Sequence, residues 1–370
     1  MSLALYRKYR PQTFKEVVGQ EYIVRTLTNA LVSGMISHAY LFSGPRGSGK
    51  TSIARILAKA VNCEDRKQNS FEPCNKCYSC LEIKQGKAID LIEIDAASHR
   101  GIDEMRDLRD GIRFGPTKSK YKVFIIDESH QLTKEASNAL LKTLEEPPSY
   151  AIFILATTEI HKMIPTIISR CQRFDFCKLT LEEIIKRLEF ICEKEGIKIE
   201  KPALELIALN AGGAVRDAES LLDRVSAFSI DRKNEIKAED IKDILGLVEI
   251  NQVSKFTDLI IQKEPAQAID FLNELINKGQ DVQEFNRALV NYLRQALLLK
   301  ISGGVSENNP LITGLTKEET QNLEKQTEKF TTQELQKIIN LFLQAENRIK
   351  YASIPQLPLE LAIVEIIVEK

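Results

Sequence analysis

The fold is decided by one short stretch, Gly44-Pro45-Arg46-Gly47-Ser48-Gly49-Lys50-Thr51. It has the G-x-x-x-x-G-K-[ST] spacing of a loop that wraps nucleotide phosphates. The apolar run 39–42 before it suits a buried strand, and residues 53–61 behind it carry apolar side chains at helical spacing. Strand, glycine-rich loop and helix are the context that the motif requires. A glycine-rich turn ahead of an ordinary helix is the alternative, and this context argues against it.

The residue types in this loop match the chemistry of phosphate binding. Glycines let backbone N–H groups close on the phosphates without Cβ clashes, and the start of the following helix adds partial positive charge. We expect the Lys50 ammonium to neutralise the β- and γ-phosphates and the Thr51 hydroxyl to bind Mg²⁺.

A second motif lies at Asp127-Glu128, where the hydrophobic pattern 121–126 ends in two carboxylates. In a parallel sheet, functional groups gather at the carboxyl ends of the strands, beside the phosphate loop. Asp127 is suited to hold Mg²⁺, directly or through water, and Glu128 to polarise the attacking water. An exposed acidic strand end is the alternative interpretation. Together the two motifs predict ATP or GTP hydrolysis by in-line attack of water.

The hydrophobic pattern changes character along the chain. Strand-like runs rich in Ile and Val occupy 39–42, 90–94, 121–126 and 151–156, which suits a parallel sheet with helices on both faces. Apolar spacing of three and four then predicts helices at 181–192, 203–211, 217–228, 252–262, 265–277, 281–301, 316–326, 332–350 and 357–369. The sequence therefore predicts an α/β domain followed by all-α domains, divided as 1–178, 179–245 and 246–370.

Composition limits the remaining classes. A chain of 370 residues is long enough for two or three domains, and 43% hydrophobic with 28% charged residues is an ordinary globular composition. The formal net charge is −1, so any binding to nucleic acid has to be local. We find no uninterrupted apolar stretch of membrane-spanning length and no signal-peptide pattern, and we expect a cytoplasmic location.

Four of the seven cysteines lie close together, as Cys63, Cys74, Cys77 and Cys80. The C-x10-C-x2-C-x2-C spacing suits tetrahedral thiolate coordination of zinc. An iron–sulfur site is an alternative, although such sites often carry a proline after the last ligand and Leu81 follows here. We expect thiols and metal rather than disulfides. The remaining three cysteines lie in apolar surroundings and are predicted to be buried thiols: Cys171, Cys177 and Cys192.

Several further segments carry a family resemblance. They are residues 6–14, 17–21, 91–98, 140–148, 155–159 and 169–171. On these residues the chain resembles the gamma/tau subunits of bacterial DNA polymerase III, which are clamp-loader AAA+ ATPases. The resemblance is dense through residue 245 and looser beyond it. It implies a RecA-like AAA+ P-loop domain at 1–178, a zinc module at 63–80, a three-helix lid at 179–245 and a helical collar at 246–370.

The resemblance also implies roles for residues outside the two motifs. The segment around Tyr6, Arg7, Arg10 and Val18 would cradle the adenine. Thr158, rather than Thr157, would be the polar sensor of the γ-phosphate; Arg216 would reach that phosphate from the lid; Arg170 would act in trans on the ATP of a neighbouring subunit. A guanidinium fork matches phosphate oxygens and keeps its charge. Without the family pattern, surface salt bridges would be the preferred interpretation of both arginines.

The function implied by the resemblance is that of the ATPase motor subunit of a sliding-clamp loader, with ATP, Mg²⁺ and Zn²⁺ as cofactors. ATP binding would open the clamp, and primer–template DNA would trigger hydrolysis. The partners implied are the other subunits of a five-membered ring, the clamp, and DNA bound independently of sequence, with Arg100 and Arg106 as the expected phosphate contacts. DNA-directed DNA polymerase activity would belong to the holoenzyme, since no polymerase site is evident in this chain.

Two other functions stay open from the sequence. One is an AAA+ remodelling or helicase-type motor acting on another substrate, which the tau-like opening and the cysteine module argue against. The other is a structural subunit that does not hydrolyse ATP, which the intact Lys50, Asp127 and Glu128 oppose. The chain stops at Lys370, about where a collar would finish, and a truncated, gamma-like or naturally short protein would each fit.

Overall fold

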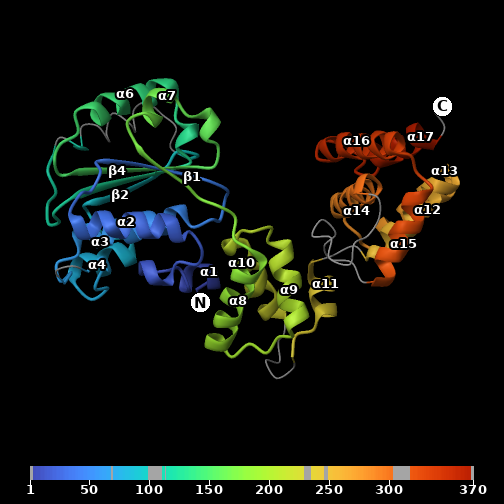
Figure 1. The fold of residues 1–370 in the computed structure, drawn as a ribbon, viewed down its shortest axis with the longest axis horizontal. Coiled ribbons are helices and arrows are strands. Elements are labelled where there is room, and N and C mark those ends of the chain that lie inside the picture. Colours follow the sequence, from blue (N-terminus) through green and yellow to red (C-terminus); the bar gives the residue numbers. More distant parts are fainter. Residues whose placement is uncertain are drawn as a thin grey trace. The chain divides into compact units, whose positions relative to one another are not determined.

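The computed structural model describes residues 3–67, 70–98, 111–112, 114–228, 235–245, 249–302 and 317–367. The chain forms two compact units, Met1–Ala238 and Glu239–Lys370. The first is α/β and the second is helical, which confirms the predicted fold class (Figure 1). The finer division at residues 178 and 245 stays a prediction.

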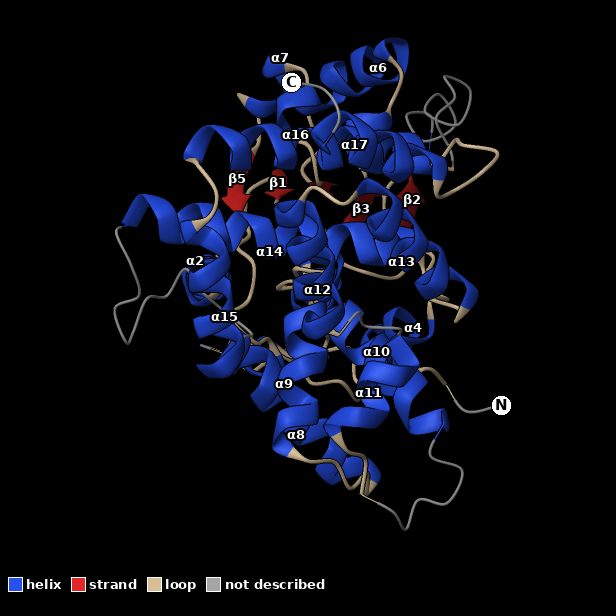
Figure 2. Cartoon of the chain, turned by 90° about the vertical axis from the view of Figure 1, so that its right-hand side faces the viewer, coloured by secondary structure: helices blue, strands red, loops and turns tan. Residues whose placement is uncertain are grey.

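A five-stranded sheet forms the centre of the first unit. Its order is β2-β3-β4-β1-β5 and every pair is parallel. Figure 2 shows β5 and β2 at the outside, with β1 and β3 between them. The strands are β1 (Ala39–Ser43), β2 (Leu91–Asp95), β3 (Lys122–Asp127), β4 (Ala151–Thr157) and β5 (Gln172–Asp175).

The four predicted strands are confirmed to within one residue, and β5 was not predicted. In β5 only Phe174 is buried, since Gln172, Arg173 and Asp175 are exposed. An edge strand of this kind needs one apolar side chain to dock on the sheet, so it lacks the apolar run that marks a central strand. The other edge strand, β2, is likewise only half-buried.

The two faces of the sheet bury alternate residues of the same strands. Tyr40 and Phe42 pack in a core with side chains of α2 and α3, whereas Leu41 and Phe153 pack on the opposite face with side chains of α6 and α7. Figure 1 shows these helix pairs on opposite sides of the sheet. The period of two in a strand produces this split, because successive side chains point to opposite faces. The helices of this layer are α1 (Leu5–Lys8), α2 (Glu21–Ser33), α3 (Lys50–Asn62), α4 (Tyr78–Gln85), α6 (Lys134–Glu145) and α7 (Pro165–Ile168).

A small helical bundle completes the first unit. The three helices expected here are confirmed to within three residues at each end, and a capping box formed by Thr180 and Glu183 starts the first of them. Leu188, Ile207 and Leu222 are buried in this bundle. A further helix, α11 (Ala238–Leu245), was not predicted; it starts at the last residue of the first unit, and its other residues belong to the second. The three expected helices are α8 (Leu181–Glu195), α9 (Lys201–Asn210) and α10 (Val215–Phe228).

The second unit consists of helices around one apolar core. Phe256 lies at its centre, with ring centroids 5.2 Å from Phe285 and 6.3 Å from Phe342. All six predicted helices are present. They are α12 (Ile250–Gln262), α13 (Pro265–Asn277), α14 (Val282–Ser302), α15 (Lys317–Glu328), α16 (Thr332–Ile349) and α17 (Leu357–Ile367). Among the described residues of the whole chain, no helix has the length and hydropathy needed to cross a membrane.

The prediction of three buried thiols is correct for Cys192 only. Cys171 is half-buried and Cys177 is exposed. Burial raises the pKa of the Cys192 thiol to about 11 and that of Cys171 to about 12. Cys177 follows the edge strand β5, where its backbone rather than its side chain makes the contacts: its N–H donates to Gln20 Oε1 (3.1 Å) and its carbonyl accepts from Gln20 Nε2 (2.7 Å).

Candidate functional site

The parallel register brings the two sequence motifs to one edge of the sheet. Ser43 at the end of β1 pairs with Thr157 at the end of β4, and Asp127 at the end of β3 pairs with Asp95 at the end of β2. The glycine-rich loop leaves β1 at this edge, and Gly44 N–H donates to the Thr157 carbonyl (3.1 Å). The phosphate loop and the acidic strand end are therefore neighbours in space, as the sequence predicts.

Two glycines of the loop allow a close approach that any side chain would prevent. A Cβ on Gly44 would lie 2.5 Å from the carbonyl oxygen of Phe176. A Cβ on Gly47, which has a left-handed φ of +77°, would lie 2.8 Å from Ala214 Cβ at the start of α10. The loop is thus held between the strand layer and the helical bundle.

The functional groups of the loop face the acidic strand end. Lys50, which is 6% exposed, donates from Nζ to the carbonyls of Gly44 and Pro45 (both 2.8 Å). Burial lowers the pKa of its ammonium, and the carboxylates of Glu128 and Asp127 act in the opposite direction. Thr51 Oγ1 donates to Asp127 Oδ2 (2.8 Å), so the two residues expected to bind Mg²⁺ are in direct contact.

Glu128 has an unusual backbone and a fixed carboxylate. Its φ and ψ of 47° and 43° are left-handed, which is uncommon for a residue with a side chain. Its Oε2 accepts from Thr158 Oγ1 (2.9 Å) and lies 3.4 Å from the donor Thr158 N. The neighbouring Thr157 is fully buried and its hydroxyl contacts His130 instead. Of the two threonines considered for the sensor, Thr158 is therefore the one that contacts Glu128.

The loop opens onto a pocket with three walls. The first wall is residues 46–53 with Asp127 and Glu128. The second is the N-terminal segment, and the third is the helical bundle, so that predicted residues from distant parts of the sequence meet here. The N-terminal wall comprises Tyr6, Arg10, Pro11, Glu16, Val17 and Val18, and the helical wall Leu179, Arg187, Val215, Arg216 and Glu219. The Arg216 guanidinium lies 4.9 Å from the centroid of the Tyr6 ring, which links these two walls.

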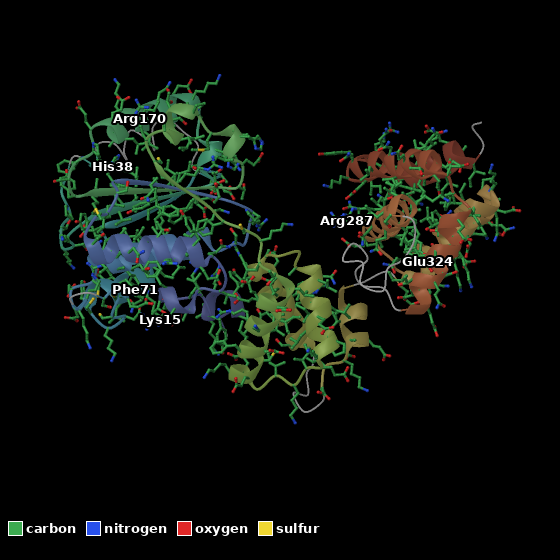
Figure 3. The ribbon with its side chains drawn as sticks, viewed as in Figure 1. Lys15, His38, Phe71, Arg170, Arg287 and Glu324 are labelled. Atoms are coloured by element: carbon green, nitrogen blue, oxygen red, sulfur yellow. The ribbon has the colours of Figure 1, made fainter. Side chains whose placement is uncertain are left out.

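Five predicted residues are not part of the pocket lining: Arg7, Gly44, Pro45, Thr158 and Arg170. Gly44 and Pro45 accept hydrogen bonds from Lys50, and Thr158 contacts Glu128. Arg7 is exposed, and its Nε donates to Tyr6 OH (3.0 Å). Arg170 follows α7 and is paired with Glu145 at 2.6 Å, with its side chain 34% exposed. Figure 3 shows Arg170 beside α6 and α7. Arg100 and Arg106, the expected DNA contacts, lie outside the described residues.

A buried ion pair in the pocket wall was not predicted. Arg187 of α8 donates from Nε to Glu219 Oε1 of α10 (2.8 Å), and its Nη2 donates to the carbonyl of Tyr9. Burial raises the pKa of the Glu219 carboxyl, and Arg187 acts in the opposite direction. The ion pair connects α8 with α10, and the hydrogen bond to Tyr9 connects α8 with the N-terminal segment. The only local signal is a charged residue on an otherwise apolar face of each helix, and it does not indicate that Arg187 and Glu219 meet.

Replacing Arg187 with Met is expected to destabilise the protein by about 3–5 kcal/mol at pH 7, because it leaves the Glu219 carboxylate buried and unpaired. The folded-state pKa of Glu219 is raised, so the unfolded state ionises first as the pH rises and the folded state is penalised above that point. The variant should therefore recover part of the loss when the pH falls from 7 to 5. Urea unfolding at both pH values measures this.

Arg287→Met is the matched control. Arg287, labelled in Figure 3, also forms two ion pairs, at 2.7 Å to Glu284 and 3.2 Å to Glu346, but its side chain is 50% exposed. Exposed pairs contribute at most about 1 kcal/mol, so this variant should stay close to the parent protein. Equal losses in the two variants, or a loss for Arg187→Met that does not change with pH, would contradict the explanation.

The four clustered cysteines form a second candidate site, which begins directly after α3 and does not line the pocket. The Sγ atoms of Cys63, Cys74, Cys77 and Cys80 all lie within 4.8 Å of one another. A tetrahedral zinc with Zn–S bonds of about 2.3 Å would place the sulfurs about 3.8 Å apart, so a small adjustment would close the site around one ion.

The sulfur atoms of this cluster accept backbone hydrogen bonds. The N–H groups of Lys76 and Cys77 lie 3.3 and 3.2 Å from Cys74 Sγ. Burial acts to raise the pKa of the Cys74 thiol, but these two backbone donors, together with the side chains of Cys77 and Cys63, outweigh it and lower the pKa to about 7. Cys80 is more deeply buried, and burial raises the pKa of its thiol. Thiolate character at Cys74 suits a metal ligand.

The cysteine module contacts the segment that leads to the pocket. Glu72 accepts from the N–H groups of Phe14 (2.9 Å) and Lys15 (3.0 Å), and the rings of Phe14 and Phe71 meet edge to face at 6.5 Å. Figure 3 shows Lys15 and Phe71 on the same side of the sheet. Because Glu16 and Val17 line the pocket, this module supports one of its walls.

Three family models match the chain. Residues 19–180 match the model described as DNA polymerase III, delta subunit. Residues 183–230 match the ATPase lid domain of the DNA polymerase III clamp loader subunit. Residues 236–370 match domain III of DNA polymerase III subunits gamma and tau.

Whole proteins show the same similarity. DNA polymerase III subunit tau of Bacillus subtilis is 46% identical over 98% of this chain and 63% of its own length. The tau subunit of Escherichia coli is 40% identical over 82% of this chain and 47% of its own length. DNA polymerase III subunit gamma of Buchnera aphidicola from Acyrthosiphon pisum is 36% identical over 98% of both chains. The chain thus spans less than two thirds of these tau relatives.

Solved structures are more distant. The RuvB Holliday junction branch migration motor of Thermotoga maritima aligns with a TM-score of 0.48 and 21% identity, over 68% of this chain and 79% of that one. The clamp loader delta protein of Bacillus subtilis aligns with a TM-score of 0.40 and 16% identity, over 93% and 99%.

Proposed function

Because the chain belongs to the family of DNA polymerase III gamma and tau subunits, we propose that it is the ATP-hydrolysing motor subunit of a sliding-clamp loader. The observation that carries the proposal is the direct contact of Thr51 with Asp127 beside Lys50 and Glu128. An intact set of this kind is expected in a subunit that hydrolyses ATP and not in one that only supports a ring.

The pocket walls suggest how the substrate is held. The loop N–H groups and Lys50 would bind the phosphates, and Arg216 would reach the terminal phosphate from the helical bundle. The apolar side chains of Val17, Val18, Leu179 and Val215 would enclose the purine, with Tyr6 and Arg10 beside it. Arg7 does not line the pocket, so it would act on the N-terminal wall through its hydrogen bond to Tyr6.

The hydrolytic step would depend on Glu128, which accepts a proton from the attacking water, and on Thr158, which orients that carboxylate. Mg²⁺ held by Thr51 and Asp127 would supply charge neutralisation at the β- and γ-phosphates. Arg170 would complete the site of a neighbouring subunit, where its guanidinium would stabilise the charge of the transition state.

The cysteine module would hold one structural zinc ion through Cys63, Cys74, Cys77 and Cys80. Four thiolates fill a tetrahedral site, so no position remains for a catalytic water. The short sulfur separations favour one ion, since an iron–sulfur cluster places several atoms between its thiolates. Zinc here would stabilise the fold rather than take part in the reaction.

The proposed partners are other clamp-loader subunits, the clamp, and primer–template DNA in the cytoplasm. The helical second unit would join subunits into a ring. Arg100 and Arg106 stay the proposed phosphate contacts, and such contacts would make DNA binding sensitive to salt and insensitive to sequence.

Reconstitution with the other loader subunits, a clamp and primed DNA tests the proposal. The wild-type assembly should hydrolyse ATP and deposit clamps on DNA, with ATP use stimulated by clamp and DNA together. Glu128→Gln should lower ATP turnover about 10²–10⁴-fold, because the amide cannot accept the water proton. ATP should still bind with an unchanged Kd, since the loop and Lys50 are intact.

Asp175→Asn is the control variant, because Asp175 lies on β5 outside the pocket lining, with its side chain 60% exposed beside Arg173. It should retain both ATP binding and ATP turnover. Turnover by wild-type protein that ignores the clamp but responds to another DNA structure would favour the helicase-type alternative. An assembly that deposits clamps equally well with Glu128→Gln would contradict the motor role.

A further inference from the structure

One buried titratable group beside the site has no role in the function proposed so far. His130 lies two residues after Glu128, in the 3₁₀ turn Ser129–Gln131, and its side chain is only 6% exposed. Buried histidines normally have a polar partner that explains them. Here the partners are parts of the catalytic edge of the sheet.

Each of three consecutive residues after β3 makes a side-chain contact with one of three consecutive residues at the end of β4. Glu128 accepts from Thr158 Oγ1 (2.9 Å), Ser129 Oγ donates to the Ala156 carbonyl (3.0 Å), and the His130 ring contacts Thr157 Oγ1. The segment Glu128–His130 is therefore fixed to the neighbouring strand at each of its three residues. A left-handed residue such as Glu128 persists only where its surroundings hold it in this way.

The His130 ring lies among three residues. Its Nδ1 is 3.0 Å from Thr157 Oγ1 and 3.5 Å from Glu128 Oε2, and its Nε2 is 3.5 Å from Glu159 Oε1. Thr157 Oγ1 also accepts from Glu159 N–H (3.0 Å). In the neutral tautomer with the proton on Nε2, the Thr157 hydroxyl donates to Nδ1 and the Nε2–H faces Glu159. The ring thus fills the space between the Glu128 and Glu159 carboxylates.

Glu159 has its own exposed partners. Lys162 Nζ lies 2.6 Å and His161 Nε2 3.4 Å from Glu159 Oε2, with the side chains 56% and 73% exposed. Glu159 therefore does not depend on His130 for a counter-charge, whereas His130 is the buried group that separates it from Glu128.

We propose that His130 is a positioning residue for ATP hydrolysis, which holds the Glu128 carboxylate in place by joining its turn to Thr157 at the end of β4. This rests on the proposed function, since it assigns a role in the same reaction. Without the ring, only two of these three contacts remain, and the Glu128 carboxylate loses the side chain that packs beside it and separates it from the like charge of Glu159. A displacement of about 1 Å at a reacting group can lower the rate about 10²-fold.

His130→Ala should lower kcat for ATP in the reconstituted loader about 10²-fold while leaving KM and the Kd for ATP unchanged. The phosphate loop and Lys50 do not contact the ring, so ground-state binding has no reason to change. His130→Asn should restore much of the rate, because its amide can take the place of Nδ1 beside Thr157. His161→Ala is the matched control: it also removes a histidine beside Glu159, but an exposed one, and should leave kcat unchanged.

A double variant separates positioning from general support of the fold. If His130 acts through Glu128, then His130→Ala combined with Glu128→Gln should be no slower than Glu128→Gln alone. Multiplied losses in the double variant would overturn the proposal, as would an unchanged kcat for His130→Ala or an equal loss of kcat and ATP affinity that His130→Asn does not relieve. If the wild-type assembly itself fails to hydrolyse ATP, the proposed function fails instead, so the two failures are distinct.

Discussion

Replacing Arg170 with Ala is expected to lower ATP turnover of the reconstituted loader about 10³–10⁵-fold, the range measured for arginine fingers in GTPases. The physical reason is that charge develops on the transferring phosphoryl group, and a guanidinium supplied by a neighbouring subunit stabilises it. ATP binding should persist, because the pocket of the same chain does not include Arg170. Single-turnover hydrolysis and a separate ATP-binding measurement distinguish these effects.

The structure is consistent with action on another subunit. Arg170 follows the short helix α7, with its side chain 34% exposed, and its Nη1 also donates to the Thr166 carbonyl (2.9 Å). Its partner Glu145 is half-exposed, so the pair costs little to separate when a phosphate competes for the guanidinium.

Arg173→Ala is the matched control for Arg170→Ala. Arg173 lies on β5 three residues away, is 46% exposed and pairs with Asp175 at 2.8 Å. It should leave turnover unchanged. In an assembly with two or more copies, mixing Arg170→Ala chains with Glu128→Gln chains should restore turnover at interfaces where an intact Glu128 meets an intact Arg170. Full activity of the Arg170→Ala assembly, or full activity of the isolated wild-type chain, would refute action in trans.

Loss of the bound metal should unfold at least the lobe around residues 63–80. Zinc contributes about 10–16 kcal/mol in small zinc modules, whereas a whole domain is stable by only about 5–15 kcal/mol. Cys77 and Cys80 are both buried, so Cys77→Ser with Cys80→Ser removes two ligands from the interior of the module. Metal analysis should find about one zinc per wild-type chain and none in the double variant, and unfolding should be monitored with and without chelator.

The same double variant should weaken ATP binding, although no cysteine lines the pocket. Glu72 of the module holds the N–H groups of Phe14 and Lys15, and the pocket wall begins again at Glu16. Cys177→Ser is the control, because Cys177 is exposed and lies outside the cluster; zinc content and ATP affinity should both be retained. Iron in place of zinc, or no metal in freshly reduced protein, would contradict the zinc assignment.

Prediction from sequence succeeded for features that are formed by residues close together in the sequence. The loop 44–51 needs only its own strand, glycines and helix, and the structure has β1 and α3 on either side of it. The central strands can be recognised in the sequence as continuous apolar runs, because both of their faces are buried. The edge strand β5 was missed for the opposite reason, since one buried side chain, Phe174, leaves no pattern to read.

The sequence by itself determined the phosphate loop, the acidic strand end, the cysteine cluster and the succession of helices, because each depends on short-range spacing. Only the tertiary structure decided which threonine contacts Glu128, that His130 lies between two carboxylates, and that Arg187 and Glu219 meet in the pocket wall. Some of these contacts join residues that are far apart in the sequence, and others involve only one of two adjacent residues. They are determined by the parallel register of the strands and by the packing of helices on them. The spacing of residues within a short segment therefore cannot predict such contacts.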